Sequence, residues 1–193
     1  MKKNLLFIMN KLVCGGAEKA LISVLETIDY TKYNVDLFLF QHQGIFMSKI
    51  PKEVNLLPEP ENYRYFDMSF QESMSQLMRK GKLRTAFSRG ALGYLSKTQE
   101  NSAIVEQGLW RFLSSTIKPI KQEYDTAIGF LEKNPIYFCV DKVQANVKIG
   151  WIHTDYNKLG LNMERERIFF NQLDYVVTVS EELRNILQDL FPE

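Results

Sequence analysis

A chain of 193 residues that is 45% hydrophobic and 24% charged has the composition of an ordinary globular protein, which argues against intrinsic disorder. Its 24 Lys and Arg residues balance 23 Asp and Glu residues, so the net charge of +1 provides no general attraction for nucleic acid. Cys14 and Cys139 have neither metal-ligand nor C-x-x-C spacing, which predicts two small buried side chains in a reducing compartment.

The amino-terminal stretch MKKNLLFIMNKLVCGG partly imitates a secretory lipoprotein signal. Asn10 and Lys11 interrupt its apolar run, and bulky Val13 stands before the cysteine, where cleavage requires a small residue. No window of the sequence approaches the roughly 20 apolar residues of a transmembrane helix. These features predict a soluble, cytoplasmic chain.

The first part of the chain alternates strand and helix patterns. The apolar run NLLFIM precedes a helical pattern whose apolar face comprises Ala17, Ala20, Leu21, Val24, Leu25 and Ile28. The next run, NVDLFLFQ, places Val35, Leu37 and Leu39 on one side and Phe38 and Phe40 on the other. Apolar residues on both sides are typical of a central parallel strand that helices cover on both faces. A short third strand, EVNLL, ends at two prolines.

Strand patterns disappear between about residues 63 and 118, where a helical segment with several glycines is predicted as an insertion. The alternation resumes with YDTAIGFL, a helix around Pro135 to Val140, the strand ANVKIGWIH, a helix from Met163 to Phe170, and the strand DYVVTVS. In the last helix, EELRNILQDL, Ser180 is the expected N-cap and Leu183, Ile186, Leu187 and Leu190 form the expected buried face. The order predicts one α/β domain over residues 1–193, with a doubly wound parallel sheet.

Gly15 and Gly16 separate the first strand from the first helix. In an open parallel sheet, ligands bind beyond the carboxyl ends of the strands, where a glycine turn exposes backbone N–H groups to a phosphate or another anion. The patterns G-x-G-x-x-G and G-x-x-x-x-G-K-[ST] are absent, which argues against a nicotinamide enzyme and a conventional NTPase. An anion site and a simple tight turn both fit the two glycines.

His153 and Asp155 follow the strand ANVKIGWIH at the same edge of the predicted sheet. An imidazole can donate a hydrogen bond to a sugar hydroxyl or carry a proton near neutral pH. The alternative is a histidine that caps a loop carbonyl, but the position of His153 favours a functional role. We interpret His42, the other histidine, as structural because it has no partners at a recognised spacing.

The segment from Ser73 to Gln99 contains six basic residues and no acidic one. The basic residues are Arg79, Lys80, Lys82, Arg84, Arg89 and Lys97, and they are interleaved with Leu83, Phe87, Leu92, Tyr94 and Leu95. Basic and aromatic residues on helices predict a patch for anionic lipid, with a solvated helical face as the alternative.

Three stretches, KNLLFIMNKLVCGGAEKALISVLETI, KIGWIHTDYN and DYVVTVSEELRNIL, resemble the N-terminal half of retaining GT-B glycosyltransferases that act on bacterial cell-surface polysaccharides and glycolipids. The shared marks are the G-G-A-E-[KR] opening, the histidine of a W-x-H strand end, and the V-S-E start of the final helix. The resemblance covers about Lys3 to Gln43 and Asp125 to Leu190 and does not extend to the middle segment.

The resemblance implies a Rossmann-like, acceptor-binding domain that faces a second, donor-binding domain across a cleft. The donor would be a nucleotide sugar, most simply a UDP-sugar, and no other cofactor is implied. No second Rossmann unit appears in this sequence, so we expect the chain alone to be inactive and to need a donor-binding domain. The alternative is a non-catalytic subunit that docks a separate donor-binding chain on the membrane.

The same resemblance implies roles for single residues. Gly15 and Gly16 would approach the donor diphosphate, and His153, as the catalytic residue, would hydrogen-bond the donor sugar. Asp155 would contact the acceptor, with loop capping as the alternative, and Glu18 would cap the first helix. The sequence has no D-x-D triplet, which favours metal-independent transfer. A cell-envelope saccharide or lipid-linked acceptor would suit a peripheral position at the inner face of the plasma membrane.

Overall fold

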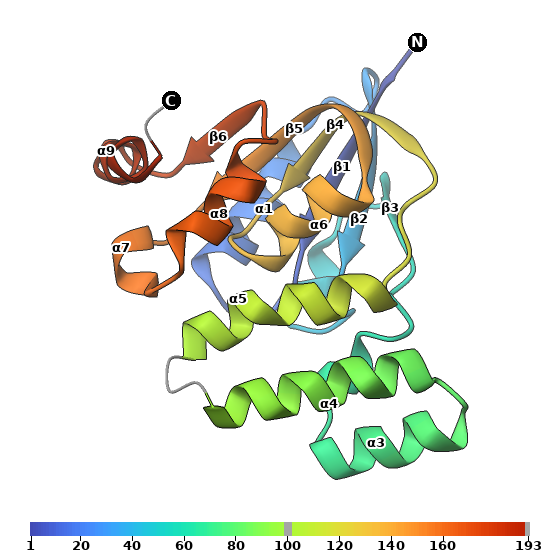
Figure 1. Ribbon diagram of the computed structural model, residues 1–193. Coiled ribbons are helices and arrows are strands. Elements are labelled where there is room, and N and C mark those ends of the chain that lie inside the picture. The colour runs from blue at the N-terminus through green and yellow to red at the C-terminus, as the bar shows by residue number, and fades with distance from the viewer. Residues whose placement is uncertain (99–101, 192–193) are drawn as a thin grey trace.

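The computed structural model describes residues 1–98 and 102–191 (Figure 1). Residues 99–101, which include Gln99 of the basic segment and belong to the predicted insertion, lie outside the described residues, as do residues 192–193. Six strands form one sheet in the order β3-β2-β1-β4-β5-β6, and all neighbouring pairs are parallel. The strands are β1 (Lys3–Met9), β2 (Tyr33–Leu39), β3 (Val54–Leu56), β4 (Glu123–Gly129), β5 (Gln144–Ile152) and β6 (Tyr175–Thr178).

Helices cover both faces of this sheet (Figure 1). They are α1 (Gly16–Thr27), α2 (Arg64–Asp67), α3 (Phe70–Arg79), α4 (Leu83–Thr98), α5 (Ser102–Leu113), α6 (Asn134–Lys142), α7 (Tyr156–Leu159), α8 (Met163–Phe170) and α9 (Glu181–Leu190), with short 3-10 turns η1 (Met47–Lys49) and η2 (Ser114–Thr116). The predicted α/β class with a doubly wound parallel sheet is confirmed, and the architecture is consistent with a Rossmann-like fold.

Strand β2 separates two hydrophobic cores, as its two-sided apolar pattern predicts. Val35, Leu37 and Leu39 pack in the core beneath α1, whereas Phe38 and Phe40 pack in the core beneath α5 and α6. Each such fully buried side chain stabilises the fold by about 1.5–3 kcal/mol.

The two directions of winding meet between β1 and β4. Helix α1 leads from β1 to β2, and α6 leads from β4 to β5 on the other side. Because such crossovers are right-handed, helices that lead in opposite directions lie on opposite faces and leave a crevice at the carboxyl ends of β1 and β4. At the end of β4, a Cβ on Gly129 would lie 2.8 Å from the Cα of Ile136, so this glycine allows α6 to pack closely on the strand.

The helices α2 to α5 occupy the range where the sequence predicts the insertion. Helices α3, α4 and α5 are stacked below the sheet in Figure 1, with α5 nearest to it and α3 farthest away. Asn62 Nδ2 donates to the carbonyl oxygen of Thr116 at 2.9 Å, which joins the two ends of the insertion. Trp110 Nε1 donates to Asp141 Oδ2 at 2.7 Å and so fastens α5 to α6. No helix in the described part of the chain is both long and apolar enough to span a bilayer.

Two local predictions can be compared directly with the structure. The Ser180 hydroxyl accepts a hydrogen bond from Leu183 N at 3.2 Å, which confirms the predicted N-cap of α9. Cys139 is buried, as predicted, and burial raises the pKa of its thiol to about 12. The prediction of a buried Cys14 is wrong, because this residue lies in the exposed turn before α1.

Candidate functional site

The glycine turn at the start of α1 has one covered and one open residue. Gly15 is the N-cap of α1, and a Cβ on Gly15 would overlap Glu18 Oε2, which shows that the Glu18 carboxylate folds back over the turn. Apart from the adjoining residues and the backbone of α1 itself, no described atom lies within 4 Å of a Cβ on Gly16. Within the described residues Glu18 accepts no hydrogen bond, so it complements the positive end of α1 by its charge rather than as the hydrogen-bonding cap that the sequence suggested.

His153 follows β5 on the same side of the sheet as α1. Its ring lies 5.0 Å from the ring of Phe130 and is stacked nearly parallel to Trp151, with 6.1 Å between centroids. Desolvation lowers the pKa of His153, and the negative charges of Glu132 and Glu18 partly oppose this effect. The imidazole is therefore mainly neutral at pH 7, with its ring nitrogens available as one hydrogen-bond donor and one acceptor.

Glu132 is a residue of this edge that the sequence analysis missed. It is 6% exposed and accepts hydrogen bonds from the backbone N–H groups of His153 and Thr154, each at 2.5 Å. The carboxylate thereby fixes the turn after β5 against the turn after β4. The next residue, Lys133, has a φ of 64°, a strained backbone conformation of the kind that concentrates at functional sites. An acidic residue just after a buried strand at the ligand-binding edge was the available sequence signal.

Buried polar atoms without a partner gather at this edge. In the described residues, five buried side-chain atoms make no hydrogen bond: Asn10 Oδ1, Asn134 Oδ1, Trp151 Nε1, His153 Nε2 and Thr178 Oγ1. They lie just after β1, at the start of α6 after β4, at the end of β5, and at the end of β6. Buried polar groups in proteins are nearly always hydrogen-bonded, so this concentration indicates a site for a ligand rich in hydroxyl or other polar groups.

Asp155 and His42 have local partners. The Asp155 carboxylate caps α7 by accepting from Asn157 N at 3.0 Å and forms an ion pair with Lys158 at 3.2 Å. These contacts favour the loop-capping alternative over contact with an acceptor. His42 Nε2 lies 3.0 Å from the carbonyl oxygen of Leu57, which agrees with its interpretation as a structural residue.

The six basic residues of the middle segment are carried by the insertion and not by the edge that holds His153. Lys82 Nζ pairs with Glu61 at 2.5 Å and donates to Asn62 Oδ1 at 2.8 Å. Arg89 donates to the carbonyl oxygens of Tyr65 and Met68, at 3.0 and 3.1 Å. These two side chains therefore hold the insertion together. The other four, Arg79, Lys80, Arg84 and Lys97, are exposed.

The chemistry open to this edge is therefore hydrogen bonding to a polar ligand beside a neutral imidazole and two carboxylates. No cluster of three His, Cys, Asp or Glu side chains suited to a metal ion occurs among the residues that the structure describes. Comparison with protein-family models and with curated proteins gives no match.

Proposed function

We propose that the chain is the acceptor-binding half of a retaining, metal-independent GT-B glycosyltransferase. The enzyme would move a sugar from a nucleotide-sugar donor, most simply a UDP-sugar, to a cell-envelope saccharide or lipid-linked acceptor. The observation that carries the proposal is the set of unpartnered buried polar atoms along the carboxyl edge of the sheet, which includes His153 Nε2 and also holds the glycine turn of α1.

The arrangement of charges supports a specific division of roles. In retaining transfer, the acceptor hydroxyl replaces the nucleoside diphosphate at the anomeric carbon through a transition state that resembles an oxocarbenium ion. The neutral imidazole of His153 would hydrogen-bond a hydroxyl of the donor sugar. Glu132 would position His153 through its backbone. The carboxylate of Glu18 lies over Gly15 and would repel a diphosphate there, so we place the closest approach of the diphosphate at the open Gly16.

The first test concerns the chain by itself. Because the proposal assigns the nucleotide base and ribose to a separate donor-binding domain, the chain alone should have no transfer activity and should bind nucleotide sugars only weakly. Isothermal calorimetry with UDP-, GDP- and ADP-sugars, together with a product assay, measures both properties. Micromolar binding or turnover by the isolated chain would contradict this division of labour.

The second test uses the enzyme assembled with its donor-binding domain. Loss of one preorganised hydrogen-bond donor should make the His153→Ala enzyme about 10- to 1000-fold slower in turnover, with the fold intact by circular dichroism. His42→Ala is the matched control, because this histidine contacts the carbonyl of Leu57, and its turnover should be unchanged. Wild-type kinetics in a folded His153→Ala enzyme would remove His153 from the reaction.

A second candidate function is supported by the insertion. Met78, Leu83, Phe87 and Tyr94 are large apolar side chains that are 59–78% exposed, which suits a chain whose task is to dock a catalytic partner on a membrane. In that case His153→Ala would leave transfer by the assembled enzyme unchanged, whereas substitutions on this exposed face would reduce it. The kinetic experiment therefore separates the two candidates.

A further inference from the structure

A basic pocket lies between the insertion and the end of α6. It has a volume of about 670 Å³ and is bounded by the start of α4, the turn η2, the loop before β4 and the last residue of α6. Its charged lining residues are Glu61, Lys82, Arg84, Lys118 and Lys142. None of the residues that line the pocket belongs to the candidate functional site, so the two sites are separate.

The pocket has an excess of positive charge. Glu61 pairs with Lys82, and no ion pair within the described residues neutralises Arg84, Lys118 or Lys142. Among the described residues that line this concave surface, one acid therefore faces four bases. Such an arrangement favours a ligand that carries at least one negative charge.

The start of α4 adds polar groups to the same pocket. This helix has 16 residues, and the backbone N–H groups of its first turn point away from the helix with no intrahelical acceptor. Thr85, in that turn, lines the pocket and is 4% exposed, yet its hydroxyl makes no hydrogen bond within the described residues. A hydroxyl that has no partner among the described residues, on a largely buried side chain beside a helix N-terminus and several basic residues, is suited to the oxygen atoms of a phosphate group.

An apolar surface begins where the pocket ends. Leu83 lines the pocket and also a shallow groove on α3 and α4 that includes Met78, Phe87 and Tyr94. Leu83 is 65% exposed, Phe87 is 78% exposed and Tyr94 is 73% exposed. A free anion needs no apolar neighbour, whereas a phospholipid presents a phosphate next to hydrocarbon.

We propose that this pocket binds the phosphate of an anionic phospholipid headgroup while Met78, Leu83, Phe87 and Tyr94 insert into the bilayer interface. The inference deepens the membrane part of the proposed function and rests on it. It also refines the basic segment of the sequence: Arg84 contacts the headgroup, and Lys118 and Lys142, which lie outside that segment, contribute equally.

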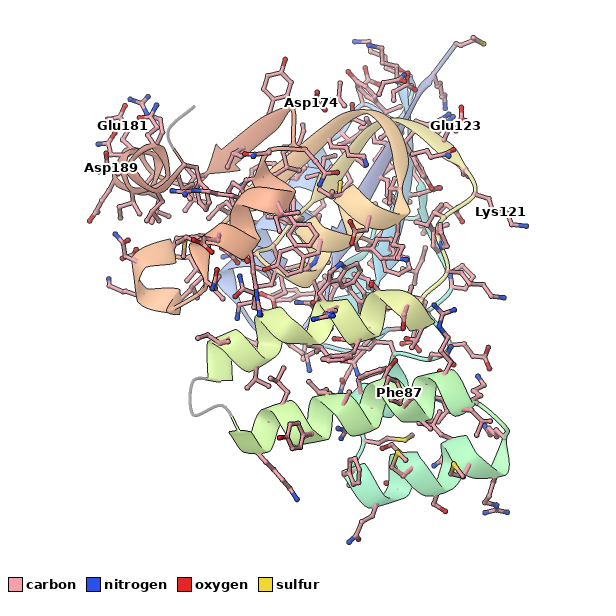
Figure 2. All side chains as sticks on the ribbon, viewed as in Figure 1. Phe87, Lys121, Glu123, Asp174, Glu181 and Asp189 are labelled. Carbon is pink, nitrogen blue, oxygen red and sulfur yellow. The ribbon has the colours of Figure 1, made fainter. Side chains whose placement is uncertain are left out.

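Vesicle sedimentation of the whole chain tests the proposal. At low salt, the wild-type chain should bind phosphatidylglycerol vesicles and bind phosphatidylcholine vesicles only weakly. The double variant Lys118→Gln/Lys142→Gln should bind phosphatidylglycerol vesicles about 10- to 30-fold more weakly, at about five-fold for each base removed. Lys121→Gln, on the loop that leads to β4 and outside the pocket, is the matched control and should lose less than about two-fold (Figure 2). Equal losses of vesicle binding in the double variant and in Lys121→Gln would show that the pocket is not the phosphate site.

Two further variants test the insertion of apolar side chains into the bilayer interface. Phe87→Ser should weaken vesicle binding at low and at high salt, because salt does not screen apolar insertion. Ile168→Ser, at a residue on α8 that is 61% exposed, should bind like the wild type. Identical behaviour of the Phe87 and Ile168 variants would overturn insertion by this surface.

A further experiment distinguishes a lipid phosphate from free phosphate as the ligand of the pocket. Calorimetry with inorganic phosphate should show no binding below millimolar concentration. Tight binding of inorganic phosphate that the double lysine variant abolishes, in a chain that ignores phosphatidylglycerol vesicles, would overturn the lipid assignment and indicate a site for a soluble anion. None of these measurements requires glycosyl transfer, so failure of the transferase proposal and failure of the lipid proposal can be told apart.

Discussion

The carboxyl edge of the sheet and the outer face of the insertion, on α3 and α4, differ in the kind of side-chain group that has no partner. Around His153, polar atoms are buried without a hydrogen-bond partner, whereas on α3 and α4 large apolar side chains such as Phe87 are exposed. A buried polar group gains most from a ligand that supplies hydrogen bonds in a small enclosed space. An exposed apolar surface gains most from an extended apolar partner. On this basis we propose small-molecule recognition for the first region and surface attachment for the second.

A buried carboxylate joins α5 of the insertion to the helices that follow β4 and β5. Glu166, on α8, is fully buried and accepts hydrogen bonds from Gln107 Nε2 on α5 at 2.7 Å, from the Tyr137 hydroxyl on α6, and from the Tyr156 hydroxyl on α7 at 3.3 Å. Desolvation raises the pKa of Glu166 even though these hydrogen bonds favour its ionised form. The insertion is thus held to the helices of the sheet through a network whose energy depends on protonation.

The largest expected effect is on the free energy of unfolding, and it should differ between a phenylalanine of the carboxyl edge and a phenylalanine of the insertion. Phe130 is fully buried between Phe7 and Trp151, so Phe130→Ala should lower the free energy of unfolding by about 3–5 kcal/mol. Phe87→Ala removes an exposed ring and should change the same quantity by less than about 0.5 kcal/mol. Urea denaturation followed by tryptophan fluorescence measures both. A large loss of stability in Phe87→Ala would mean that this ring packs in the fold and is not a surface for a partner.

A smaller effect on the free energy of unfolding is expected at Glu166, which joins α5 to the helices that follow β4 and β5. Because the folded-state pKa of Glu166 is raised, its contribution to stability is fully present below the unfolded pKa of about 4.5 and is lost as pH rises through the folded pKa. Glu166→Gln cannot ionise, so the stability of the wild type relative to this variant should fall as pH rises from about 4 to 8. Urea denaturation at a series of pH values gives this difference. A difference that is independent of pH, or that grows with pH, would contradict the raised pKa.

The comparison also shows which features the sequence could predict. The two-sided apolar pattern of β2 and the N-cap at Ser180 depend on neighbours along the chain, and both were predicted correctly. The same is true of the placement of Gly15 and His153 at the carboxyl edge, since the carboxyl ends of all strands in a parallel sheet meet there.

Contacts between distant segments could not be predicted. Glu132 acts on backbone N–H groups that follow β5, and nothing in the sequence FLEKNP indicates which turn will lie beside it. Glu166 belongs to the charged run MERER, which is typical of a solvated helix, and it is buried because Gln107 and two tyrosines surround it. Arg89 resembles any base of a surface patch until the carbonyl oxygens of Tyr65 and Met68 are placed next to it.

The smallest expected effect is a change in the pKa of His153 in a variant that keeps the fold intact. A Cβ on Gly15 would overlap only the flexible end of Glu18, so Gly15→Ala should change the free energy of unfolding by less than about 0.5 kcal/mol and should move the carboxylate away from the turn. The negative charge of Glu18 raises the pKa of His153, so displacement of this carboxylate should lower that pKa further.

Gly16→Ala is the matched control, because its added Cβ meets open space. An NMR titration of the two histidines measures the change, with His42 as an internal reference. A rise in the pKa of His153, or the same shift in both alanine variants, would show that Glu18 does not act on His153 and would remove the electrostatic link between the glycine turn and the imidazole.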